Sequence, residues 1–437
     1  FTDELLKDLI EGFSAISLGN AAVDTDILGD AYEYLVGKFA DVTRRNKAGE
    51  FYTPRSVVRM MVEILDPKEG ESIYDPACGT GGFLIDAVDY LLAKYSENPQ
   101  EVPIYGEDWL EKRGQTLEEA KAEIPTLQTY RKGHGERIPD WGRLEASLFG
   151  IDVSRQIMRI AVMNLVLHGV EHARLKRGNT LSETGGLSED DLARRYKVIL
   201  SNPPFAGVLP KDSIRRDLPT TSKKSELLFL GVMMEALAPG GRCAVVVPEG
   251  LLFGSTGAHK GLRRKLLTDF ELLGVVSLPA GVFKPYAGVK TAVLVFRRPP
   301  EGATPSLDKV WFYEVANDGY DPDRISGGAR PETPPKNEIP ALMRAWAEYR
   351  DSGFKKPPGV EANILLEAGS DDPRAWWATL GTIEANDWNL AAGRFKPRMG
   401  ETPPDDDPRE LIKQTLKLEI EIRSGLETLL QDIEEPA

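Results

Sequence analysis

Cysteine is scarce in this chain of 437 residues, which has only Cys78 and Cys243. Two cysteines cannot build a disulfide framework, and no Cys/His cluster has the spacing of a metal site. Long apolar runs are missing too, because stretches such as 243–247 and 292–296 fall far short of the ~18 apolar residues that a membrane span requires. We therefore expect no metal, no membrane span and a location in a reducing cytoplasm.

Positively charged residues are also fewer than negatively charged ones: the chain has 54 Lys and Arg and 68 Asp and Glu, which gives a net charge of −14. Cations that neutralise phosphates dominate the affinity of proteins that bind nucleic acid on their own. Two interpretations remain open: a basic patch is hidden in an acidic average, or a partner supplies most of the contacts. The hydrophobic fraction of 41% and the charged fraction of 28% are those of an ordinary globular protein.

Strands and helices alternate between residue 71 and about residue 300. Repeated alternation predicts an α/β fold with a doubly wound, mainly parallel sheet and helices on both faces. Residues 95–145 interrupt the alternation with a mixed polar stretch, which we interpret as an insertion. The expected strands are 72–75, 147–152, 196–201, 242–248, 272–279 and a final one at 290–298, and the expected helices are 83–95, 154–169, 225–241 and 260–270.

The two ends of the chain differ from this central part. Residues 1–46 carry apolar residues at three- and four-residue steps, so we expect the remnant of a helical N-terminal domain in a truncated piece. Another helix is expected from about Pro54 to Leu65. Near the C-terminus, the helix 409–433 carries an apolar stripe that either docks on a partner or packs back onto its own domain. The predicted domains are 1–46, 47–310, an extension at 311–400, and an acidic linker with the final helix at 401–437.

A glycine-rich turn, DPACGTGG at 75–82, lies between the first strand and the next helix. Gly79, Gly81 and Gly82 allow a tight turn and a close approach of a ligand to the backbone. On its own, this turn is compatible with a nucleotide, another ligand or a purely structural role. Asp152 ends the next strand, where it could accept hydrogen bonds from a ribose; alternatively, Asp152 or Ser154 caps the following helix.

The segment SNPPF at 201–205 is the most specific signal, because it also ends a strand. The lone pair of an adenine amine is delocalised into the ring, which makes the amine a poor nucleophile. The side-chain carbonyl of Asn202 and the backbone carbonyl of Pro203 could accept both amine hydrogens and favour a pyramidal nitrogen. Pro203 and Pro204 stiffen the loop, and Phe205 offers a flat face for an extruded base.

Basic residues follow this loop. They are interpreted either as phosphate contacts at the mouth of the site or as a solvated polar loop. They are Lys211, Arg215, Arg216, Lys223 and Lys224, with Arg263, Arg264 and Lys265 further on.

The motifs DPACGTGGF and NPPF, in this order, resemble those of DNA methyltransferases that methylate amino groups. The segments GEFYTPRSVVRMMVEIL, LAPGGRCAVVVPEGLLF and NDWNLAAGRFKP are similar to blocks in modification subunits of type I restriction-modification systems. The resemblance covers roughly residues 20–437. It implies a Rossmann-like class I methyltransferase sheet with a partial helical N-terminal domain and a helical C-terminal extension.

The resemblance also implies a cofactor and roles for individual residues. The cofactor would be S-adenosylmethionine, with Asp152 on its ribose. Asn179 stands where the family usually has Asp facing the adenine ring of the cofactor. Asn202, Pro203, Pro204 and Phe205 would form the catalytic loop. The other residues expected at the cofactor are Phe51, Tyr52, Thr53, Pro54, Asp75, Ala77, Cys78, Gly79, Thr80, Gly81 and Gly82.

The function expected from these signals is N6-methylation of an adenine flipped out of double-stranded DNA. The resemblance implies a separate specificity subunit, a possible restriction subunit and two copies of this chain per complex. Two alternatives stay open: an enzyme that methylates a protein glutamine or RNA, and an inactive scaffold subunit. The blocks at 47–65 and 383–397 speak against the first alternative, and the intact NPPF against the second.

Overall fold

The computed structural model describes residues 53–397 except 107, 134–139, 206, 285–287, 322, 326–329, 356–363 and 367–372, together with five residues between 416 and 423. Several predictions therefore lie outside the described residues: the helical remnant 1–46, the roles of Phe51 and Tyr52, the acidic linker and most of the helix 409–433. The predicted domain boundaries stay predictions.

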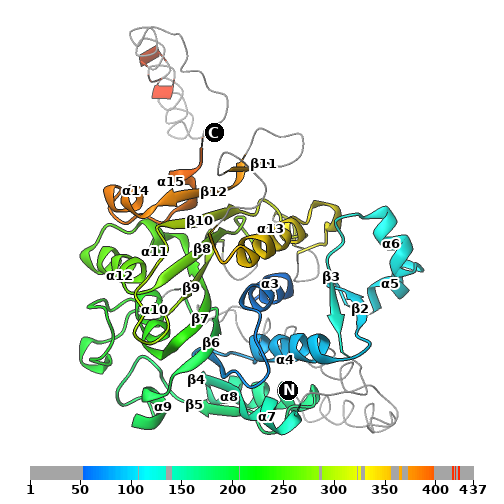
Figure 1. Cartoon of the computed structure of the whole chain (residues 1–437), viewed down its shortest axis with the longest axis horizontal. Helices are drawn as coiled ribbons and strands as arrows, with labels where there is room; N and C mark the ends of the chain where they lie inside the picture. Colours follow the sequence, from blue (N-terminus) through cyan, green and yellow to red (C-terminus); the bar gives the residue numbers. More distant parts are fainter. Residues whose placement is uncertain are drawn as a thin grey trace, which may run out of the picture. The chain divides into compact units, whose positions relative to one another are not determined.

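A mixed sheet forms the centre of the described chain (Figure 1). Five parallel strands follow the order β5-β4-β1-β6-β7, and the antiparallel strand β9 lies between β7 and β8. Beyond β8, the sheet continues with β10, β12 and β11. The bounds are β1 Ile73–Asp75, β4 Leu148–Asp152, β5 Arg174–Arg177, β6 Tyr196–Ser201, β7 Leu237–Pro248, β8 Glu271–Ser277, β9 Thr291–Arg297, β10 Lys309–Glu314, β11 Ile364–Leu366 and β12 Pro373–Thr379.

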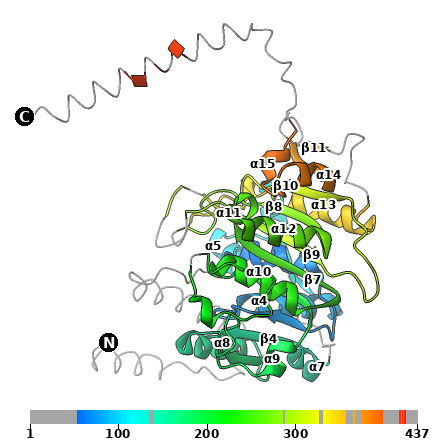
Figure 2. The same cartoon turned by 90° about the vertical axis from the view of Figure 1, so that its left-hand side faces the viewer.

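Helices cover both faces of this sheet, as Figures 1 and 2 show. Alternate residues of β6 face opposite ways: Val198 and Leu200 join the core beneath α3, α4 and α13, whereas Ile199 joins the core beneath α10, α11 and α12. The doubly wound α/β prediction is confirmed. The bounds are α3 Arg55–Leu65, α4 Gly82–Tyr95, α7 Trp141–Ala146, α8 Arg155–Leu167, α9 Glu189–Ala193, α10 Ser225–Ala236, α11 Glu249–Phe253, α12 Gly257–Thr268, α13 Ile339–Asp351, α14 Leu380–Ala385 and α15 Ala392–Phe395.

The interruption predicted at 95–145 leaves the main sheet. It contains an antiparallel pair, β2 (Gln100–Pro103) and β3 (Thr129–Lys132), and two short helices, α5 (Asp108–Arg113) and α6 (Leu117–Glu123). A small core of its own holds this part together, formed by Trp109, Ala120, Ile124 and Leu127. None of the described helices combines the length and apolar character needed to cross a bilayer.

The sequence missed four strands of the main sheet, β5, β10, β11 and β12, and misplaced the end of one helix. The Arg-Leu-Lys-Arg stretch of β5 is polar and mostly exposed, so it lacks an apolar strand pattern. The strand 290–298 was expected to be the last, which is wrong because β10 and β12 follow it in the same sheet. Helix α10 ends at Ala236, and the segment Leu237–Gly241 begins β7 instead of closing the helix.

Candidate active site

The carboxyl ends of β1, β4 and β6 are neighbours in the sheet, because β1 pairs with β4 on one side and with β6 on the other. The three predicted polar positions Asp75, Asp152 and Asn202 stand at or directly after these strand ends. Parallel strands therefore bring three motifs that are far apart in the sequence to one edge of the sheet. This edge is where ligands bind in open α/β folds.

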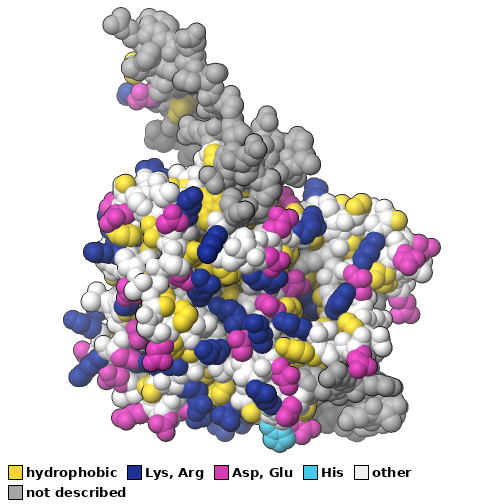
Figure 3. All heavy atoms as spheres, in the orientation of Figure 1, with side chains coloured by type: hydrophobic (Ala, Val, Ile, Leu, Met, Phe, Trp, Pro, Cys, Tyr) yellow, Lys and Arg dark blue, Asp and Glu magenta, His cyan; other side chains and the backbone are white. Residues whose placement is uncertain are grey.

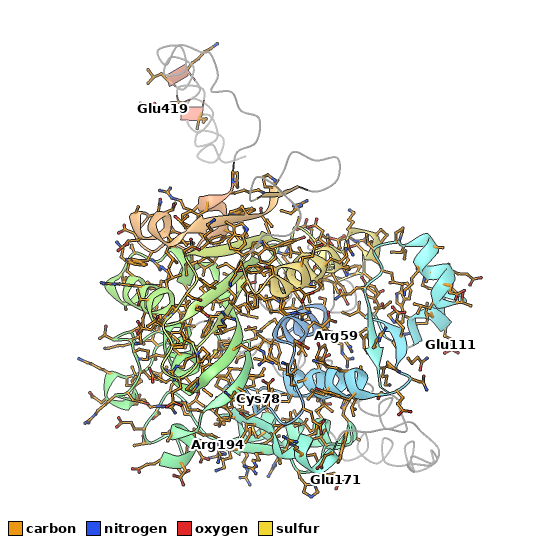
Figure 4. The ribbon with its side chains drawn as sticks, in the orientation of Figure 1. Arg59, Cys78, Glu111, Glu171, Arg194 and Glu419 are labelled. Atoms are coloured by element: carbon orange, nitrogen blue, oxygen red, sulfur yellow. The ribbon has the colours of Figure 1, made fainter. Side chains whose placement is uncertain are left out.

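The turn between β1 and α4 has a backbone that requires glycine. Gly79 and Gly81 have φ angles of 55° and 88°, in the left-handed region that side chains rarely adopt. Among the described residues, a Cβ atom added at Gly79 or Gly82 would meet no atom of another residue within 4 Å, so open space lies in front of this turn. Cys78, labelled in Figure 4, is buried within this turn, and burial raises the pKa of its thiol well above the usual value. The thiol is therefore no candidate for a nucleophile.

Asp75 holds the base of the turn. Its carboxylate accepts a hydrogen bond from the Ala77 amide (3.0 Å) and another from the Ser201 hydroxyl (2.7 Å), which ties β1 to the end of β6. The residue is 1% exposed, and this burial raises the pKa of its carboxyl to about 7. A carboxyl with this pKa changes its charge near neutral pH.

Asp152 connects β4 to the same turn. One carboxylate oxygen accepts from the Ser154 amide (2.8 Å) and the other from the Gly79 amide (3.3 Å). Ser154 itself caps α8, because its hydroxyl accepts from the Ile157 amide (3.3 Å). Of the two candidates for the cap, the structure selects Ser154, and the Asp152 carboxylate is directed to the glycine-rich turn.

Asn202 has an unsatisfied carbonyl. Its amide nitrogen donates to the Thr53 hydroxyl at 2.9 Å, so the predicted segment before α3 meets the catalytic loop. Its Oδ1 atom is buried and has no hydrogen-bond partner among the described residues. A buried carbonyl without a donor is costly, which marks the atom as one that awaits an external donor. Phe205 lies edge-on to the buried Phe283, with 5.8 Å between the ring centres.

Two further asparagines border the turn. Asn179 uses its side-chain carbonyl locally, on the Leu181 amide (3.0 Å), and the next residue, Thr180, donates to the Pro76 carbonyl (3.3 Å). The predicted contact of Asn179 with the cofactor stays a prediction. Sequence reasoning missed Asn164 of α8, whose amide donates to the Thr80 carbonyl (3.1 Å). An asparagine on the buried face of an amphipathic helix was the signal that could have found it.

Two of the predicted phosphate contacts are buried. Arg215 is 7% exposed, pairs with Asp217 and donates to the Thr180 carbonyl. Arg263 is 1% exposed and donates to backbone carbonyls, including that of Leu251. Neither guanidinium can reach a phosphate from there, so both assignments are wrong.

The other basic residues of the loop after Phe205 remain exposed: Lys211, Arg216, Lys223 and Lys224. Figure 3 shows that lysine and arginine side chains gather across the middle of the face seen in Figure 1. Within the described part of the chain, no group of three or more His, Cys, Asp and Glu residues could hold a metal ion.

The strand order β5-β4-β1-β6-β7-β9-β8, with a glycine-rich turn after β1 and an acidic residue at the end of β4, defines a class I methyltransferase, a class that uses S-adenosylmethionine. The family model described as N-6 DNA Methylase matches residues 23–120 and 131–401. The chain therefore belongs to the N-6 DNA methylase family of adenine-specific DNA methyltransferases, as a modification subunit of the type I restriction-modification kind. The predicted fold class and family are confirmed.

Individual relatives agree with this family. The chain is 31% identical to the type I restriction enzyme EcoEI methylase subunit of Escherichia coli, over 98% of this chain and 73% of that protein. It is also 31% identical to the EcoKI methylase subunit of Escherichia coli K12, over 66% of this chain and 48% of that protein. A solved chain from a type I restriction-modification system matches with a TM-score of 0.61 and 31% identity, over 99% of this chain and 76% of that one.

Proposed function

We propose that this chain transfers a methyl group from S-adenosylmethionine to the N6 atom of an adenine flipped out of double-stranded DNA. The observation that carries the proposal is the buried, unsatisfied Oδ1 of Asn202, beside the open space in front of the glycine-rich turn. Flipping is required because the amine cannot reach a methyl donor from inside the base stack.

The catalytic loop acts by positioning. The Thr53 hydroxyl holds the amide nitrogen of Asn202, which fixes the direction of its carbonyl. That carbonyl and the backbone carbonyl of Pro203 accept the two hydrogens of the adenine amine, so the nitrogen becomes pyramidal and its lone pair is available for reaction. The ring of Phe205, braced by Phe283, stacks on the extruded base. Preorganised acceptors of this kind need no reorientation during the reaction.

The residues of the turn fit S-adenosylmethionine. The left-handed glycines and the open space before Gly79 and Gly82 leave room for a ligand against the backbone. A carboxylate has several acceptor positions, so the Asp152 carboxylate suits the two hydroxyls of a ribose. When bound, the cofactor supplies an electrophilic methyl group on a positively charged sulfur. Asp75 contributes negative charge near that sulfur once its carboxyl is ionised.

Cofactor affinity should depend on pH through Asp75. Its carboxyl, with a pKa of about 7, is mostly protonated in the free protein at pH 6 and mostly ionised at pH 8. A cationic ligand favours the ionised form, so binding releases a proton and affinity rises about tenfold between those pH values. Calorimetry in two buffers with different ionisation enthalpies measures this release. Asp75→Asn should remove the pH dependence, and an unchanged dependence in that variant would exclude Asp75 as its source.

We further propose that sequence choice comes from a separate specificity subunit, with two copies of this chain in the complex and a restriction subunit as a possible third component. The net charge of −14 supports this arrangement, because such a chain binds DNA weakly by itself. Purified chain alone should methylate DNA poorly, and adding the specificity subunit should raise the rate by more than about tenfold. Robust, sequence-specific methylation by the chain alone would refute the proposed dependence on a specificity subunit.

The chemistry is tested by transfer of a radioactive methyl group to double-stranded DNA, RNA or total protein, followed by nucleoside analysis. We expect N6-methyladenine in DNA. If radioactivity accumulates in protein or RNA and none in DNA, then DNA is not the substrate and the proposal is contradicted. If purified chain binds the cofactor but no assembly of it methylates any acceptor, the chain is an inactive scaffold.

A further inference from the structure

A polar pocket lies on the helices that follow β7. Its volume is about 370 Å³, and it lies between the α11–α12 segment and the segment from α14 to α15. Phe253, Ser255 and Lys260 line it from the first segment, and Asn386 and Arg394 from the second. None of these side chains has a role in the proposed methyl transfer.

Positive charge dominates this pocket. Three of its lining residues, Lys260, Arg263 and Arg394, are cations, whereas Asp387 is its single acidic lining residue among those described. Lys260 pairs with Asp387 at 3.0 Å, and Arg394 donates to the side-chain oxygen of Asn386 at 3.0 Å. In a chain with a net charge of −14, a local excess of cations indicates an anionic ligand.

The backbone on one side of the pocket is strained. Asp387 and Trp388 have φ angles of 61° and 59°, which non-glycine residues rarely adopt. The buried guanidinium of Arg263 donates to both of their carbonyls and, on its other side, to those of Leu251 and Gly254. Strained backbone of this kind clusters at binding sites, where the surroundings hold it in place.

A short chain of contacts joins the pocket to the catalytic loop. The Ser225 hydroxyl donates to the Pro204 carbonyl (3.2 Å), so the start of α10 is fixed to that loop. Helix α10 packs against α12, which carries Lys260. The pocket is therefore joined to the catalytic loop through α10 and α12.

We propose that this pocket binds a phosphodiester of the DNA strand that flanks the flipped adenine. Lys260 and Arg394 contact the phosphate, and the ring of Phe253, which is 53% exposed, packs against the adjoining sugar or base. Like other phosphate contacts, this one adds affinity for DNA without reading its sequence. The inference rests on the proposed function, because it takes DNA as the substrate.

The test compares Lys260 with a lysine outside the pocket, Lys121 of α6. Lys260 and Lys121 are 35% and 41% exposed, and each pairs with a carboxylate. Lys121→Gln is therefore a matched control for Lys260→Gln and for Arg394→Gln. The full chain is titrated with a labelled duplex of about 20 base pairs, and its affinity is measured by fluorescence anisotropy over a range of salt concentrations.

Lys260→Gln and Arg394→Gln should each weaken DNA binding by about tenfold at low salt and reduce the slope of log affinity against log salt by ~0.9. Lys121→Gln should match the wild type, and all three variants should keep the melting temperature and the cofactor affinity. Equal salt slopes in Lys260→Gln and Lys121→Gln would overturn the inference.

Two further outcomes are kept separate. If adenosine monophosphate stabilises the wild type but not Lys260→Gln, the pocket takes a free nucleotide and the inference about DNA is overturned. If the wild type binds the duplex with the expected salt slope but transfers no methyl to adenine even when the specificity subunit is added, the proposed function fails while the pocket assignment stands.

Discussion

Replacing Asn202 by alanine should lower kcat for adenine methylation by at least ~100-fold, the usual cost of losing one preorganised hydrogen-bonding group in an active site. The change removes the carbonyl that is buried without a partner and leaves the glycine-rich turn intact. Cofactor affinity, measured by calorimetry, should therefore stay within about twofold of the wild type. Single-turnover methyl transfer with a saturating DNA duplex measures the rate.

Asn202→Asp is the matched variant, because a carboxylate keeps the acceptor oxygens. The Thr53 hydroxyl, which now accepts from the amide nitrogen, can rotate and donate to the carboxylate instead. We expect a rate between those of the wild type and the alanine variant. Full activity in Asn202→Ala would remove the basis of the proposed mechanism, and equal loss in both variants would mean that the amide nitrogen is the essential group.

Replacing Asp152 by alanine should weaken cofactor binding by about 100-fold, since hydrogen bonds to a charged group contribute ~1.5–3 kcal/mol each. The carboxylate has two tasks: it holds the Gly79 amide at 3.3 Å, and it is proposed to accept from the ribose. Its loss therefore loosens the turn and removes a contact with the ligand. Calorimetric titration with S-adenosylmethionine measures the change in affinity.

The control for Asp152 is its neighbour Ser154. Ser154→Ala removes the cap of α8, which should lower the free energy of unfolding by ~1 kcal/mol and leave cofactor affinity nearly unchanged. Comparing Asp152→Ala with Ser154→Ala therefore separates an effect on cofactor binding from an effect on protein stability. If Ser154→Ala weakened the cofactor as much as Asp152→Ala, the effect would come from the position of α8, and Asp152 would lose its assignment.

Local sequence was sufficient for the centre of the site. Asp75, Asp152 and Asn202 each stand at or just after a short apolar strand, and parallel strands bring such positions to one edge without further information. The requirement for glycine at Gly79 and Gly81 was visible for the same reason, because a strand that turns at once into a helix needs left-handed backbone.

Tertiary contacts decided what the sequence could not show. Arg215 and Arg263 look like surface cations, and only the folded chain reveals the carboxylate of Asp217 and the carbonyls that draw these side chains inward. The strand β5 is polar, and its place is set by pairing with β4. Asn164 was visible as an asparagine on the buried face of α8, but its partner Thr80 lies far away in the sequence, so only the folded chain shows their contact.

The pairing of β10 along β8, and of β12 along β10, has a practical consequence. A version of the protein that ended near residue 300 would turn β8 into an exposed edge strand with unpaired backbone amides and carbonyls. Such an edge can pair with strands of other molecules and cause aggregation. The deletion would also remove Trp311 of β10, which is fully buried in the whole protein, from its place beside β8. Fragments prepared for expression should therefore keep the last strands together with the catalytic half of the chain.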